Sequence, residues 1–190
     1  MRAITFDHHA AGATLQRQVL VIALGTLALT ASSWLSIPSV PVPITMQTYV
    51  VLVTGALLGP RLGTLTVIAW LAEALVGMPV LAQGASGILP FAGPTAGYLF
   101  SFPVVAALAG FLMARRGKHR GIFYSFGIML GGNAVNLFMG ALWLATTIGW
   151  HRAFAVGVLP FLAGALAKAC MAAITIDLVR RNHRSGPEAG

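Results

Sequence analysis

Long apolar runs almost free of charge fill most of this 190-residue chain and limit what it can fold into. Hydrophobic residues make up 57% of the sequence and charged residues 8%, whereas soluble domains carry about a quarter charged residues. The runs lack the alternation of apolar and polar residues that amphipathic helices show beside water. The sequence therefore predicts an all-α integral membrane protein with one helical bundle, because no long polar linker divides the chain.

Breaks between the apolar runs predict six transmembrane helices. Prolines in "SIPSVPVPIT" at 36–45 end the first run, because proline fixes an extended backbone. The segment "GPRLG" at 59–63 predicts a tight turn between two helices of about 15 residues, for which a re-entrant hairpin is an alternative to two full spans. "GWHRA" at 149–153 predicts a short loop. The expected organisation is a cytoplasmic tail at 1–16, a single transmembrane domain at 17–180 with helices at about 17–35, 45–58, 61–76, 94–114, 122–148 and 156–179, and a cytoplasmic tail at 181–190.

Basic residues gather at alternate breaks, which orients the helices. Ten of the twelve Lys and Arg residues fall in the tails, at the helix ends next to them (Arg17 and Arg180) and in the breaks at 59–63 and 115–120, whereas Arg152 falls on the opposite side. Cytoplasmic loops carry such an excess, so both termini are predicted to be cytoplasmic. The net charge of +8 is thus explained by membrane topology and does not indicate nucleic-acid binding.

One lysine, Lys168, lies in the middle of the last apolar run. It is about 18 Å along a helix from Arg180, too far for its ammonium group to reach the cytoplasmic surface. Such a group faces a bundle interior or a wet cavity, so we expect Lys168 to bind an anion such as a substrate carboxylate, or alternatively to form a structural ion pair. The acid Glu73 could pair with Lys168, cap a polar site or reach outer water.

Four amide side chains are candidates for substrate contacts. Asn133 and Asn136 lie three residues apart and share a helix face, where they predict either helix-to-helix hydrogen bonds or a polar wall of a site. Gln47 is expected at an outer helix start and Gln83 in an outer loop. Either could bind a substrate or be merely solvated.

The outer loop at 77–93 and the helix after it provide further candidates. Glycines around Ser86 suit close approach of the backbone to a ligand. The helix start at 93–95 offers unpaired N–H groups, which attract anions, although every helix start does so. Tyr98 and the four tryptophans are expected to anchor helix ends at the membrane interface, and a pocket wall is the alternative for Tyr98.

Several functional classes lack the residues that they require. No G-x-x-x-x-G-K-[ST] motif occurs, so the chain itself has no P-loop for ATP. The five histidines lie in tails and loops, the four acidic residues are scattered, and the single Cys170 lies in an apolar run. The sequence therefore predicts neither an enzyme, nor a metal site, nor a cofactor.

Four segments together resemble the BioY family. "VPVPITMQTYVVLVTGALLGPRLG" at 40–63 is similar to the family's characteristic segment, and "GMPVLAQGASG", "FAGPTAGYLFSFP" and "LPFLAGALAKA" follow in the expected order. The resemblance covers roughly residues 20–180. It implies a biotin-specific S component of an energy-coupling-factor transporter in the bacterial cytoplasmic (inner) membrane. The implied partners are biotin, the lipid bilayer, a transmembrane coupling (T) subunit and cytoplasmic ATPase subunits on separate chains.

The resemblance also implies a pocket near the outer face, formed by the fourth to sixth helices and nearby loops. Lys168 matches the family's lysine in the sixth helix, and Gln83 and Ser86 match its polar pocket loop. The family's "PGD" segment is here Ala163, Gly164 and Ala165, so the proline and the aspartate are missing. The consequence is weaker biotin binding, a changed ligand, or compensation by Glu73 or Asn133.

The sequence also offers candidate residues for docking a partner, and it leaves two other functions open. Small residues of the first helix, among them Ala28 and Ser32, offer a close-packing face for a coupling subunit or for the bundle itself, and Arg61 could also contact a partner. The alternatives are a solitary transporter or S component for another vitamin-like ligand, and a membrane assembly protein without a ligand. In the last case Lys168 must be neutralised within the bundle, by Glu73 or by loss of its proton.

Overall fold

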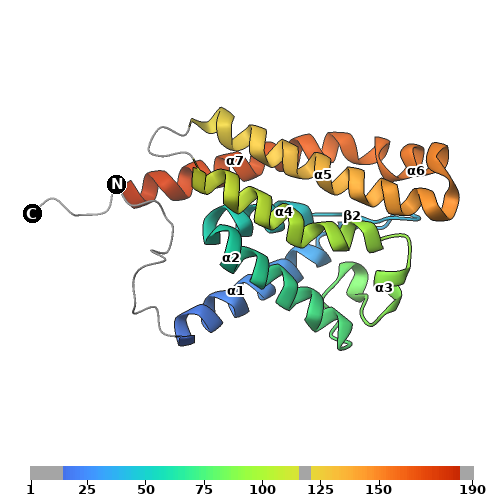
Figure 1. Ribbon diagram of the computed structural model, residues 1–190, viewed down its shortest axis with the longest axis horizontal. Coiled ribbons are helices and arrows are strands. Elements are labelled where there is room, and N and C mark those ends of the chain that lie inside the picture. The colour runs from blue at the N-terminus through green and yellow to red at the C-terminus, as the bar shows by residue number, and fades with distance from the viewer. Residues whose placement is uncertain (1–14, 116–120, 185–190) are drawn as a thin grey trace, which may run out of the picture.

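The structure is a computed structural model that describes residues 15–115 and 121–184 (Figure 1). The expected tails at 1–16 and 181–190, and the basic break at 115–120, lie partly outside the described residues. Helices account for most of the fold, as the composition predicts. The elements in chain order are α1 (Leu15–Trp34), β1 (Ser36–Ile37), β2 (Ile44–Thr45), α2 (Gln47–Leu75), the 3₁₀ turn η1 (Ala82–Gly84), α3 (Leu89–Ala92), α4 (Ala96–Arg115), α5 (Ile122–Ile148), α6 (Trp150–Gly157), the 3₁₀ turn η2 (Leu159–Phe161) and α7 (Leu162–Arg184).

Helix α2 is folded back on itself near its middle. Gly59 has a non-helical backbone (φ 81°, ψ 175°), and Pro60 follows it. A Cβ atom added at Gly63 would lie 2.8 Å from the Cα of Gly55, whereas eight residues of straight helix would separate these positions by about 12 Å. The limbs at 47–58 and 60–75 therefore pack against each other, with the "GPRLG" segment at the turn.

Five helices of the described residues are long and apolar enough to cross a membrane when α2 is counted once and α6 to α7 are taken together. Helices α4, α5 and α7 run along the molecule, α1 and the second limb of α2 lie oblique to them, and α1 begins at the same end at which α7 ends (Figure 1). The chain reversal at Gly59 lies toward this end as well. The hairpin of β1 and β2, together with α3 and α6, lies at the opposite end.

The last predicted helix differs from the structure. A helix was expected from 156 and a loop at 149–153, but Trp150–Gly157 is helical and α7 begins only at Leu162. Gly149 (φ 81°) ends α5, and Val158 (φ −120°, ψ −58°) interrupts the helix before Pro160. Proline has no N–H for the helical ladder, so the chain makes a 3₁₀ turn there instead of a continuous helix.

Glycines set the closeness of the helices that form the core. A Cβ at Gly55 would meet the backbone of Ala106 in α4, and one at Gly110 would meet the backbone of Gly59 and Pro60 in the turn of α2. Such close approach between backbones is possible only without a side chain. The α2 turn is thereby fixed against the C-terminal part of α4. The N-terminal ends of α2 and α4 lie away from this contact and line the cavity described below.

Candidate functional site

A cavity of about 390 Å³ opens between the elements at the end of the molecule that holds the β1–β2 hairpin. Its volume falls within the range of small-molecule sites, which are concave and mostly apolar with a few polar groups. The hairpin, the first turn of α2, the loop at 81–95, α4, α5 and α7 all contribute walls. The lining residues include Ser39, Pro41, Val42, Thr45, Gln47, Thr48, Leu81, Gln83, Pro90, Thr95, Tyr98, Phe102, Asn133, Asn136, Leu137, Phe161, Ala165 and Lys168.

Lys168 carries the one formal charge among the described residues that line this cavity. Its side chain is 7% exposed, and its Nζ donates to the carbonyl oxygen of Thr45 at 3.0 Å. Within the described residues no carboxylate lies within salt-bridge distance of Nζ. Because a carbonyl dipole offsets only part of a full charge, the cavity favours a ligand that presents an anionic group to Lys168.

Ala165 lies one helical turn before Lys168 and lines the same wall. The methyl group of Ala165 is 6% exposed and supplies neither a charge nor a hydrogen-bond acceptor. The neighbouring Gly164 also leaves room beside the Lys168 side chain, whose Cε would lie 3.9 Å from an added Cβ. This wall of the cavity is therefore cationic and uncompensated.

The two asparagines of α5 line the cavity and are held in place by neighbouring backbone. Asn133 donates through Nδ2 to the carbonyl of Met129 at 2.9 Å, and Asn136 donates to the carbonyl of Tyr98 at 3.2 Å and to the hydroxyl of Ser101. Among the described residues no buried side-chain nitrogen or oxygen lacks a partner. Asn136 thus joins α5 to α4, as helix-to-helix bonding predicts, and both amides also add polarity to the wall.

Tyr98 is a pocket wall, so the interface-anchor prediction for it is wrong. Its ring is stacked with Phe161 at 6.3 Å between centroids, and its hydroxyl donates to the carbonyl of Gly157 at 2.7 Å. Gly140 and Gly157 leave the space that the ring fills. Burial and a satisfied hydroxyl fix one position of the ring, which links α4 to the junction between α6 and α7.

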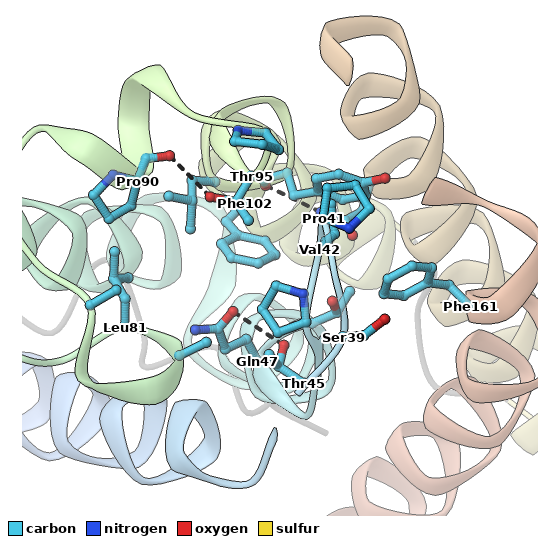
Figure 2. Close-up of a pocket in the computed structure, with 18 of the residues that line it drawn as sticks. Ser39, Pro41, Val42, Thr45, Gln47, Leu81, Pro90, Thr95, Phe102 and Phe161 are labelled. Atoms are coloured by element: carbon cyan, nitrogen blue, oxygen red, sulfur yellow. Dashed lines mark hydrogen bonds between the residues drawn. The ribbon is translucent and has the colours of Figure 1, made fainter. Parts of the chain in front are cut away.

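Apolar side chains face the cavity from the remaining directions, as Figure 2 shows. Leu81, Pro90 and Phe102 lie on one side of it, and Val42 of the hairpin and Phe161 lie on another. Thr95 donates to the carbonyl of Pro90 and so closes the loop before α4. The expected helix start at 93–95 does line the cavity.

Glu73 and Ser86, both candidates for substrate contacts, are not among the described residues that line the cavity. Glu73 belongs to the second limb of α2, which contributes no residue to the cavity wall, and it makes no ion pair with Lys168. Ser86 follows Ala85, which lines the cavity and has an extended backbone (φ −62°, ψ 146°). Ser86 itself is half-buried and is not among the described residues that line the cavity, so a role for it in ligand binding stays a prediction.

The docking candidates and Trp70 differ in how exposed they are. Ser32, for which the sequence leaves docking and packing within the bundle open, is 4% exposed and donates its hydroxyl to the carbonyl of Leu29, so it packs within the bundle. Ala28 and Arg61 are exposed. Trp70 was expected at the membrane interface, yet it is fully buried in the core, where its indole N–H donates to the carbonyl of Val80 at 3.2 Å.

The sequence gives no prediction that residues of the β1–β2 hairpin line the cavity, although six of them do. The sequence marks 36–45 only as a break with three prolines, and the two-residue strands that pair Ser36 with Thr45 and Ile37 with Ile44 add a small sheet to the predicted all-α fold. The available signal was the alternation of proline with valine, which suits an extended segment whose side chains face two ways.

Comparisons with known proteins agree with this arrangement. The family model described as "BioY family" matches residues 6–185. A protein of Pyrococcus horikoshii named "Probable biotin transporter BioY" is 33% identical over 87% of this chain and 98% of its own length. The "Biotin transporter BioY" of Rhizobium etli is 34% identical over 82% of this chain and 84% of its own length.

A solved structure is similar in fold. The "Crystal structure at 2.1 A of the S-component for biotin from an ECF-type ABC transporter" matches with a TM-score of 0.79 and 29% identity, covering 87% of this chain and 92% of that chain. These relatives are named as transporters and not as enzymes, in line with the expectation from the missing catalytic residues. The family match covers nearly the whole sequence, and the chain therefore belongs to the BioY family.

Proposed function

We propose that this chain is the biotin-binding transmembrane subunit of a vitamin uptake system and captures biotin in the cavity beside Lys168. The observation that carries the proposal is an uncompensated ammonium group in the wall of a small, largely apolar cavity. Biotin has a carboxylate, an apolar sulfur ring and a polar ureido group, and these match the cation, the apolar walls and the amides of Asn133 and Asn136. The relatives named as biotin transporters support the choice of ligand.

Six membrane crossings with both termini in the cytoplasm are part of the proposal. The two limbs of α2 each cross or re-enter, because the chain reverses at Gly59, and α1 begins at the end of the molecule where α7 ends. The basic residues Arg17, Arg61, Arg115 and Arg181 belong to this end, which the positive-inside rule assigns to the cytoplasm. The cavity then opens to the outside of a bacterial cytoplasmic membrane.

Cysteine labelling in intact cells tests this orientation. In a chain with Cys170→Ala, we expect Val40→Cys in the hairpin to react with a membrane-impermeant maleimide, because Val40 is 94% exposed. Asn182→Cys near the end of α7 is expected to react only after lysis. Reaction of both cysteines in intact cells would contradict an even number of crossings.

Uptake driven by ATP requires an ATPase as well as a substrate-binding subunit. The sequence has no P-loop, so we propose a separate transmembrane coupling subunit and cytoplasmic ATPase subunits as partners. The similar solved structure is an S component of an ECF-type ABC transporter, which supports this assignment. Docking through Ala28 and Arg61 stays a prediction. A solitary transporter, another vitamin-like ligand and a ligand-free assembly protein remain the alternatives to be tested.

Calorimetry on the purified full-length chain tests the ligand. We expect biotin and desthiobiotin to bind and biotin amide to bind at least about tenfold more weakly, because a charge-assisted bond to Lys168 is lost with the carboxylate charge. Equal affinity for biotin and its amide would mean that Lys168 does not bind the carboxylate of biotin. No binding of any of the three would contradict the proposed ligand and favour the alternatives.

A further inference from the structure

Gln47 lines the cavity, yet both ends of its amide are engaged by the protein. Its Nε2 donates to the hydroxyl oxygen of Ser33 in α1 at 2.9 Å. Its Oε1 accepts from the hydroxyl of Thr45 in β2 at 3.2 Å, the bond that Figure 2 shows between these two residues. The side chain of Gln47 is 5% exposed. An amide held on both sides is poorly placed to contact a ligand and well placed to fix its neighbours.

The anchor in α1 is buried and hydrogen-bonded to its own helix. Ser33 is fully buried and donates its own hydroxyl proton to the carbonyl of Leu29 at 2.8 Å. Its oxygen is therefore oriented as an acceptor for Gln47. The neighbouring Ser32 makes the same type of bond to Leu29, at 2.7 Å, but does not contact Gln47.

The other side of Gln47 leads to the charged group of the cavity. Thr45, whose hydroxyl is bound by Gln47, accepts the Lys168 ammonium on its backbone carbonyl at 3.0 Å. Thr45 is also paired with Ser36 in the hairpin, and Val42 near its tip is 4% exposed and packs with Tyr98 and Phe161. Three hydrogen bonds, linked through the two ends of Gln47 and through Thr45 itself, thus join α1, the start of α2, β2 and α7.

We propose that Gln47 is a positioning residue that ties the β1–β2 hairpin to α1 and, through the carbonyl of Thr45, holds Lys168 at the cavity wall. Its action on the hairpin goes beyond the proposed function and needs no ligand. Its effect on biotin affinity rests on the proposed function. The path Ser33–Gln47–Thr45–Lys168 therefore behaves as a unit, and breaking any member loosens the hairpin.

Labelling of Val42→Cys without ligand tests the positioning role. Because Val42 is buried, a cysteine there reacts with a maleimide only when the hairpin opens. In the Cys170→Ala background, we expect Gln47→Met and Ser33→Ala each to raise the rate about tenfold, the change in opening expected when a buried hydrogen bond is lost. Lys168→Met is expected to raise it as well. Ser32→Ala is the matched control and is expected to leave the rate unchanged.

A second labelling position separates hairpin opening from general loosening. Val67 is fully buried in the second limb of α2 and lines no part of the cavity. Val67→Cys is expected to react equally slowly with and without Gln47→Met. Unchanged rates at position 42 in Gln47→Met and Ser33→Ala, or equal increases at positions 42 and 67, would overturn the proposal.

A double-mutant cycle on biotin affinity distinguishes positioning from direct contact. If Gln47 acts through Lys168, Gln47→Met weakens biotin binding in the parent chain and weakens it clearly less in Lys168→Met, where only its hold on the hairpin is left to lose. Fully additive losses would mean that Gln47 acts independently of Lys168 and would overturn the positioning role toward Lys168. If the parent chain binds no biotin at all, the proposed function fails, and the labelling experiment still decides for or against the role of Gln47.

Discussion

Lys168→Met is expected to remove most biotin binding from the purified chain while the fold persists. Loss of one partner of a buried charge pair costs about 2–5 kcal/mol of binding free energy, which corresponds to about 30-fold or more in affinity. Methionine has a similar length and fills the same space, and it leaves no buried charge. Calorimetry measures the affinity, and thermal unfolding in detergent measures the stability, which is expected to stay equal or to rise.

The matched control for this change is Arg115→Met, at the opposite end of the molecule. Arg115 lies 4.4 Å from the centre of the Phe111 ring, is exposed and does not line the cavity. Its replacement removes the same charge without touching the site, and biotin affinity is expected to be unchanged. If Lys168→Met binds biotin as tightly as the parent, the lysine has a structural role and the substrate anion must be held elsewhere.

Gly110→Ala is expected to destabilise the fold strongly, because the added methyl group would meet backbone atoms. The new Cβ would fall against Pro60 and Gly59 at the chain reversal and against the carbonyl of Gly55. Added volume in a packed core costs about 1–3 kcal/mol, and backbone atoms cannot rotate away as a side chain can, so we expect the upper end of that range. Thermal unfolding and the yield of monodisperse protein provide the measurement.

Gly131→Ala gives the matched control within the same bundle. Gly131 lies in the middle of α5 and is exposed, and an added Cβ there would meet nothing within 4 Å. Alanine favours helix over glycine by up to about 1 kcal/mol, so this variant is expected to unfold at the same temperature as the parent or above it. Equal behaviour of the two variants would mean that the α2 turn does not pack on α4 as described.

The apolar runs predict the long helices, because a helix that crosses a bilayer needs about twenty apolar residues in succession. The helix at Ile122–Ile148 and the turn at 59–63 could both be located in this way. The junction near Gly157 could not, since its residues are as apolar as those on either side. The interruption there depends on Val158 and Pro160 and on a bond from Tyr98, 59 residues away in the sequence.

Residue chemistry identified some wall residues and misplaced others. Lys168 stood out because a charge deep in an apolar run needs a partner or a cavity. Glu73 stood out for the same reason, but the direction of its side chain depends on the limb of α2 to which it belongs. Thr45 gave no signal, because its backbone carbonyl is the group that matters and every residue has one.

By itself the sequence determined the membrane class, the approximate helices, the absence of a P-loop and the presence of a cation in the last helix, because these follow from composition and local periodicity. Only the tertiary structure decided which polar groups meet. Gln47 spans from Ser33 to Thr45, and Thr45 reaches Lys168 across 123 positions of sequence. Such contacts form only when the hairpin packs on the bundle, and no local pattern of residues predicts a contact between positions so far apart in the sequence.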